Sequence, residues 1–79
     1  MLKKLDELKV GETGQIKMVD GEGRLRRRLF DMGVTPGAVV KVHKLAPLGD
    51  PIEVTLRGYE LTLRKNEAHL VHVEVEEKQ

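Results

Sequence analysis

The chain has 79 residues, 39% of them hydrophobic and 34% charged, and 14 basic against 13 acidic side chains give a net charge of +1. This length predicts one small domain, residues 1–79, whose folding removes only about 60–65% of the unfolded chain's surface. The balanced charge disfavours a protein dominated by non-specific binding to polyanions. The chain contains no cysteine, which excludes disulfides, thiolate zinc sites and cysteine nucleophiles. No signal peptide or long apolar run is evident, so we expect a soluble, cytoplasmic protein with no direct membrane insertion.

Alternating apolar residues predict an all-β chain with short helical pieces. One helical turn is expected at Lys4–Leu8, and a short helical link at Lys65–His69. The predicted strands are Thr13–Val19, Val39–Leu45, Ile52–Leu56, Tyr59–Arg64 and Val71–Val75. In the first strand, Ile16 and Met18 are expected on one face. The tail Glu76–Gln79 is expected to be frayed.

One longer helix, Arg24–Met32, is predicted between the first two of these strands. Leu25, Leu29 and Met32 fall on one helical stripe, and Gly33 stands where a helix commonly ends. The predicted fold class is therefore mainly β, a small, partly open barrel of about five strands with one short helix inserted after the first strand. Barrel closure would protect the edges of so small a sheet.

The predicted helix carries the most distinctive cluster, Arg26, Arg27 and Arg28 next to Phe30. An aromatic residue among arginines is typical of recognition hot spots. The alternative is that Phe30 packs under a neighbouring loop and the arginines are a solvated face. The same cluster, Arg24–Arg28, could instead bind phosphates in a small nucleic-acid-binding barrel, although the strands offer only Tyr59 for stacking on bases.

The connection Leu45–Pro51 is stiffened by Pro47 and Pro51, with Leu48 at its tip. Two arrangements are open: Leu48 folds back onto the mouth of the barrel, against Phe30, or it is exposed and docks a partner.

Catalysis and metal binding have little support in the sequence. There is no serine and no phosphate-binding glycine loop, so we expect no enzyme activity and no cofactor. His69 and His72 are three residues apart, a spacing that suits one face of a helix, whereas on a strand it directs side chains to opposite faces. His43 belongs to a different strand. We therefore expect no dedicated metal site, with a metal-sensing role for these three histidines as the remaining alternative.

Four segments in order resemble the FeoA family, the small accessory proteins of bacterial ferrous-iron transport. The resemblance covers residues 5 to about 75 and rests on Leu5-x-x-Leu8-x-x-Gly11, on Arg26 to Gly37, on Ala46 to Ile52 and on Leu56 to Ala68. It implies an SH3-like barrel beside a large membrane permease that carries a cytoplasmic GTPase domain. It supplies no catalytic residues and no metal ligands.

The expected function is thus an adaptor that binds and modulates this permease through protein contacts. The expected partner-binding residues form one surface: Arg26, Arg27, Arg28, Phe30, Pro47 and Leu48. No nucleic-acid partner is expected, and a small nucleic-acid-binding barrel remains the alternative function.

Overall fold

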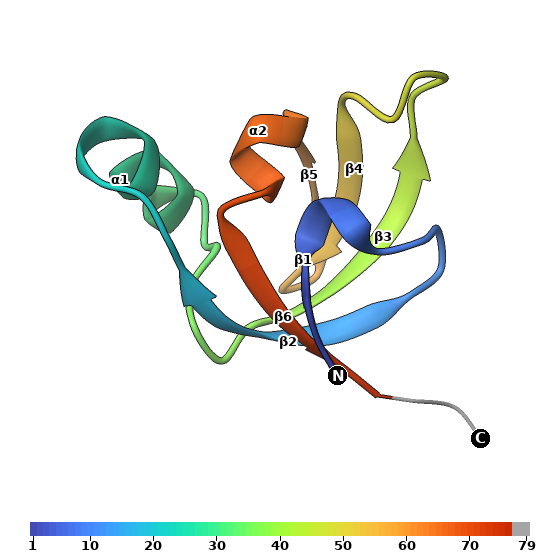
Figure 1. The fold of residues 1–79 in the computed structure, drawn as a ribbon, viewed down its shortest axis with the longest axis horizontal. Coiled ribbons are helices and arrows are strands. Elements are labelled where there is room, and N and C mark those ends of the chain that lie inside the picture. Colours follow the sequence, from blue (N-terminus) through green and yellow to red (C-terminus); the bar gives the residue numbers. More distant parts are fainter. Residues whose placement is uncertain (77–79) are drawn as a thin grey trace.

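The structure is a computed structural model that describes residues 1–76 of the chain. Its elements in chain order are β1 (Leu2–Lys4), the 3₁₀ helix η1 (Leu5–Glu7), β2 (Thr13–Val19), α1 (Gly23–Asp31), β3 (Val39–Leu45), β4 (Ile52–Leu56), β5 (Tyr59–Leu63), α2 (Lys65–Ala68) and β6 (Val71–Val75). The strands form one antiparallel sheet in the order β1-β6-β2-β3-β4-β5. Figure 1 shows this sheet bent into a small barrel, with α1 at its left side and α2 at its upper end.

The mainly β, partly open barrel predicted from the sequence is confirmed. All five predicted strands are present, and the predicted helix is found one residue earlier at each end. The sequence missed β1, a three-residue strand that pairs with β6. The sheet therefore has six strands, and the helix follows the second of them. The frayed tail was predicted for a segment whose last part, residues 77–79, lies outside the described residues.

Alternation along the strands builds the core, because every second side chain points into the barrel. The inward side chains of β3, β4 and β6 are almost fully buried, and Leu29 of α1 and Ala68 of α2 close the core from the helices. The buried apolar residues are Leu5, Leu8, Ile16, Val19, Leu29, Val34, Ala38, Val40, Val42, Ile52, Val54, Leu56, Leu63, Ala68, Val71, Val73 and Val75.

Met18 is the exception to the predicted alternation. It was expected on the same face as Ile16, which is buried, but it is 48% exposed. The pairing of β2 with β6 shifts register between these two residues. Such an irregularity inserts an extra residue and reverses the faces beyond it, so Val19 is buried in place of Met18.

Strands β2 and β6 approach each other closely at Gly14. A Cβ atom at this position would overlap Val73 Cγ1 and the Glu74 carbonyl oxygen. Its φ is not in the left-handed region, so the glycine is required here by space and not by backbone conformation.

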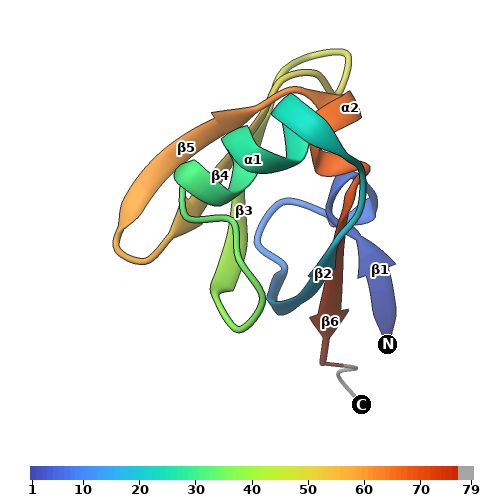
Figure 2. The same cartoon turned by 90° about the vertical axis from the view of Figure 1, so that its left-hand side faces the viewer.

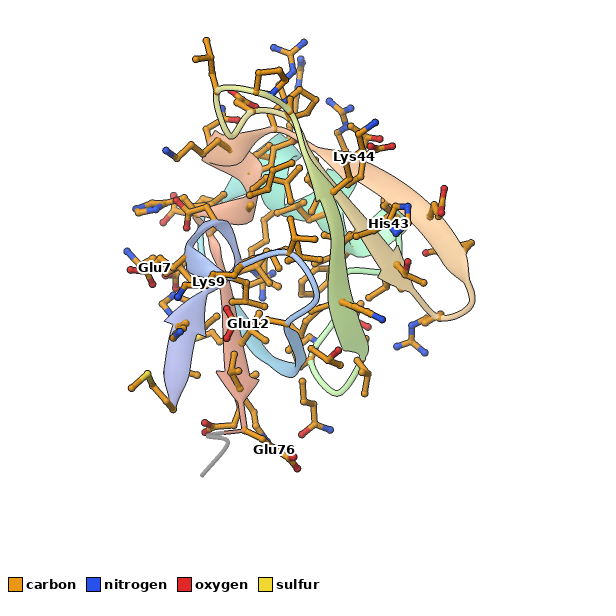
Figure 3. All side chains as sticks on the ribbon, turned by 90° about the vertical axis from the view of Figure 1, so that its right-hand side faces the viewer. Glu7, Lys9, Glu12, His43, Lys44 and Glu76 are labelled. Carbon is orange, nitrogen blue, oxygen red and sulfur yellow. The ribbon has the colours of Figure 1, made fainter. Side chains whose placement is uncertain are left out.

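The loop Lys9–Glu12, which lies between η1 and β2 in the chain, is hydrogen-bonded to β3. Gly11 N–H donates to the Val42 carbonyl oxygen at 2.8 Å, and Val42 N–H donates to the Glu12 carbonyl oxygen at 3.0 Å. Within the loop, Lys9 N–H donates to Glu12 Oε1 at 2.6 Å. This bond, followed by the charges of Lys3 and Lys9, holds the pKa of Glu12 below its usual value. Figure 3 shows Lys9 and Glu12 on this loop, beside β3.

Helix α2 has only four residues and depends on its surroundings, because a helix this short is not stable alone. Glu67, only 4% exposed, accepts a hydrogen bond from Arg64 N–H at 2.8 Å and so caps the first turn. Its other oxygen lies 3.8 Å from the Arg28 guanidinium of α1. Glu67 therefore stabilises α2 and ties it to α1.

Gly14→Ala is expected to lower the free energy of unfolding by about 2–3 kcal/mol, because the added methyl group meets backbone that cannot move without breaking the β2–β6 ladder. Urea denaturation followed by circular dichroism measures the change. The matched control is Gln15→Ala, the exposed neighbour on the same strand, with an expected change within about 0.5 kcal/mol. Equal losses in the two variants would contradict the close approach at Gly14.

Glu67→Ala is expected to destabilise the protein by about 1–2 kcal/mol, since it removes the acceptor for Arg64 N–H. Glu67→Gln keeps an oxygen acceptor and is expected to lose about half as much. Thermal unfolding of the two variants tests this order. If the glutamine variant lost as much as the alanine variant, attraction to Arg28 and not capping would be the main role of Glu67.

Candidate functional site

The predicted cluster on α1 is divided by the contacts its members make. Phe30 is partly buried and packs against the core. The Arg26 guanidinium carbon lies 4.4 Å from the centre of the Phe30 ring, within the range of a cation–π contact. Arg26 Nε also donates to the Val19 carbonyl oxygen at 3.1 Å. Phe30 and Arg26 thus form a pair that holds α1 to the barrel and leaves part of the ring accessible.

The other two arginines of the cluster, Arg27 and Arg28, differ in the contacts they make. Arg28 has a 68% exposed side chain but its guanidinium faces the buried carboxylate of Glu67. Arg27 is exposed, and within residues 1–76 it makes no hydrogen bond or ion pair. Arg26, Arg27 and Phe30 line one side of a shallow pocket that is completed by residues 21–23 and Asp31. Among Arg26, Arg27 and Arg28, Arg27 is the one that the described residues leave available to an acidic partner.

The loop between β3 and β4 exposes the second predicted anchor. Leu48 is 91% exposed, so of the two arrangements left open by the sequence, folding back against Phe30 is wrong. The loop is fixed at its base, because Ala46 N–H donates to the Pro51 carbonyl oxygen at 3.1 Å. Lys65 N–H also donates to Asp50 Oδ1 at 2.9 Å. The loop therefore presents an apolar tip on an ordered base.

The two predicted anchors are not adjacent. Figure 1 shows α1 and the β3–β4 loop on opposite sides of the upper end of the barrel, with α2 between them. The structure thus gives two patches, the helix patch (Arg26, Arg27, Arg28 and Phe30) and the loop patch (Pro47 and Leu48), where the sequence predicted one surface. A partner that contacts both patches must extend across α2.

The three histidines lie apart, each beside a different carboxylate. His43 Nε2 is 3.7 Å from Glu60 Oε1, and His69 Nδ1 is 3.1 Å from Asp6 Oδ2. His72 Nε2 contacts Asp20 Oδ2. In the part of the chain that the structure describes, no three His, Asp or Glu side chains gather as metal ligands.

A second hollow, which the sequence did not indicate, lies at the opposite end of the barrel, near the N-terminus. Its apolar wall includes Met1, Val10 and Val39, each more than half exposed. Charged residues from β1, the following loop and the end of β6 line the rest. Neither Val10 nor Val39 belongs to a distinctive local pattern, and the two come together only in the folded protein.

No helix among residues 1–76 has the length and apolar character to cross a membrane, and the longest, α1, has nine residues.

Comparison with known protein families matches residues 3–75 to the FeoA domain. A curated relative, the Fe(2+) transport protein A/Fe(2+) transporter FeoB fusion protein of Porphyromonas gingivalis (strain ATCC BAA-308 / W83), is 35% identical over 72 residues. These residues are 91% of this chain but only 8% of the length of that relative.

Solved structures share the fold. The solution structure of FeoA protein from Chlorobium tepidum is 48% identical, with a TM-score of 0.85, and the match covers 92% of this chain and 70% of that one. FeoA of Stenotrophomonas maltophilia, complexed with zinc and described as a prokaryotic SH3 domain protein, is 27% identical with a TM-score of 0.77. That match covers 94% of this chain and 89% of the other. The SH3-like barrel implied by the sequence is confirmed, and because the domain matches nearly from end to end, this chain belongs to the FeoA domain family.

Proposed function

We propose that this protein is a cytoplasmic accessory protein of bacterial ferrous-iron uptake, which binds and modulates the GTPase-coupled iron permease through protein contacts. The observation that carries the proposal is the fusion relative, in which a domain like this one shares a polypeptide with the transporter FeoB. Fusion keeps two domains at a high effective concentration, which is useful when they contact each other. Contact of this domain with the same kind of partner requires a recognition surface on the barrel.

The loop patch supplies the apolar anchor of the proposed contact. A leucine that is 91% exposed on an ordered loop has no intrachain packing role, and burying it in a partner pocket removes apolar surface from water. Because the base of the loop is fixed by hydrogen bonds, little ordering entropy is lost on binding.

The helix patch supplies charge. Arg26 and Arg28 are engaged within the chain, so we assign steering of an acidic partner to Arg27. The exposed part of Phe30, with Arg26 above its ring, adds a smaller apolar contact. Two of the four arginines in Arg24–Arg28 contact other groups of the protein, which lowers the charge that is free for phosphates, and nucleic-acid binding is the less favoured function.

Full-length permease in lipid nanodiscs is expected to bind the immobilised protein saturably, whereas empty nanodiscs do not. Leu48→Ala is expected to weaken this binding about tenfold, since it removes the most exposed apolar side chain of the surface. Biolayer interferometry measures the affinity, and thermal unfolding checks that the variant is folded. The control is Val10→Ala, an exposed apolar residue in the hollow near the N-terminus. If Val10→Ala weakened binding and Leu48→Ala did not, the contact would lie at that hollow.

Arg27→Glu is expected to slow association about threefold to tenfold at low salt, with the effect disappearing at high salt where exposed charges are screened. Lys41→Glu, an exposed residue of β3, is the matched control with an equal change of charge. Stopped-flow or interferometry measures the association rate. A defect independent of salt would assign Arg27 a packing role. Stronger binding to a single-stranded oligonucleotide than to the permease, indifferent to Leu48→Ala, would favour the nucleic-acid function.

A further inference from the structure

The sheet ends in two edge strands, β1 and β5, which differ in how they are protected from pairing with a further strand. The β1 edge is three residues long and carries Lys3 and Lys4, and Lys4 N–H donates to Glu7 Oε1 at 2.8 Å. Lysines and short length are usual ways to prevent a further strand from pairing with an edge. Strand β5 has five residues and pairs with β4 without a register shift, and it contains no lysine or proline. It therefore lacks these protections.

The turn before β5 determines which backbone groups point outward. Arg57 and Gly58 form the two-residue loop of the β4–β5 hairpin, with φ of 50° and 85°. Positive φ at both positions is the type I′ arrangement, which makes the flanking Leu56–Tyr59 pair a hydrogen-bonded one. Hydrogen-bonded and non-hydrogen-bonded pairs alternate along an antiparallel ladder. The N–H and C=O groups of Glu60 and Thr62 consequently face away from β4.

These four backbone groups are open to pairing. Within residues 1–76 neither Glu60 nor Thr62 has a backbone hydrogen bond beyond the sheet, and no side chain bonds to their main chain. Both residues are exposed, so no helix or loop among residues 1–76 buries them. Figure 2 shows β5 at the rim of the sheet, with α1 in front of the sheet and the β3–β4 loop above it. The free edge thus runs near both patches of the proposed surface.

We propose that the free edge of β5 binds an extended segment of the partner protein as a seventh strand of the sheet. This inference deepens the proposed function and rests on it. The main-chain groups of Glu60 and Thr62 supply four hydrogen bonds to the added strand, and its side chains alternate between the two faces. The added strand extends the contact surface beyond the two separate patches on the helix and the loop.

The side chains of β5 define the chemistry of the segment. On the inner face, Leu61 is partly buried against the core and calls for an apolar residue opposite it. On the outer face, the Glu60 carboxylate is 66% exposed, with His43 at 3.7 Å, and calls for a lysine or arginine. Figure 3 shows His43 on this outer face, projecting from β3. The favoured segment therefore has an apolar residue flanked by polar ones, at least one of them basic.

A second copy of this chain fits the edge less well. Antiparallel pairing of two β5 strands centred on Leu61 would place the two Glu60 carboxylates diagonally on one face. Like charges at neighbouring positions of a sheet destabilise the pairing. A basic segment from another protein avoids this repulsion.

Amide hydrogen exchange of the full-length protein, read residue by residue with and without permease nanodiscs, tests the proposal. Permease is expected to slow exchange of the Glu60 and Thr62 amides at least tenfold. The amides of Leu61 and Leu63, already bonded to β4, are expected to change much less. Docking through the helix and loop patches alone would leave the Glu60 and Thr62 amides unchanged and would overturn the inference, while the permease binding that the proposed function requires would persist.

Two variants test the same hydrogen bonds by affinity. Thr62→Pro removes one outward N–H at an edge position where proline is tolerated, and is expected to weaken permease binding about tenfold. Thr62→Ala, which keeps the N–H, is the matched control and is expected to bind as the wild type does. Glu60→Lys is expected to weaken binding several-fold at low salt. If Thr62→Pro does not fold, the exchange of the wild-type amides decides alone.

The remaining outcomes separate the two proposals. Absence of any permease binding by the wild-type protein overturns both the proposed function and this inference. Protection of Glu60 and Thr62 that rises with protein concentration in the absence of permease assigns the edge to a second copy and overturns its assignment to a partner segment. Equal binding by Thr62→Pro and the wild type, with no protection, overturns the added strand alone.

Discussion

The pairing of β6 with β2 is the contact on which the rest of the barrel depends. Strand β6 lies between β1 and β2, so it joins the N-terminal strand to the β2–β5 meander. The close approach at Gly14 lets the two backbones meet, and buried valines of β6 fill the space behind them. Because more than fifty residues separate the paired strands, this ladder forms only at the cost of closing a long loop. Both helices pack on the barrel that this β2–β6 ladder closes.

The packing of α1 on the closed barrel gives the arginines of the cluster different roles. Helix α1 has one fully buried residue, Leu29, and its attachment depends on partly buried and polar contacts as well. Arg26 binds Val19 of β2, and Arg28 faces the buried Glu67 of α2. Removing Arg28 would leave a buried carboxylate without its cation, which opposes any exchange of this arginine for another partner. Of Arg26, Arg27 and Arg28, which form one cluster in the sequence, two therefore contact other groups, and Arg27 has no such contact among residues 1–76.

The sequence predicted the strands of the barrel well, because alternating valines indicate a strand with one buried face. It missed β1, since Leu2, Lys3 and Lys4 do not alternate and become a strand only by pairing with β6. It misplaced Met18, because the irregularity in β2 depends on the partner strand. The two open positions of Leu48 and the division of the arginines could not be decided from local pattern either. Each depends on contacts between residues distant in the chain, such as Arg28 with Glu67.

The spacing of the exposed features constrains how a partner can bind. The molecule exposes 5298 Å², and a standard interface would cover about 800 Å², roughly a seventh of it. One leucine at a loop tip and a few side chains on a two-turn helix cover much less than that, and α2 separates them. A stable complex therefore requires further contact surface at the same end of the barrel. The free edge of β5 provides it with backbone groups that lose no side-chain entropy, which is why an extended segment is a better occupant than a globular face.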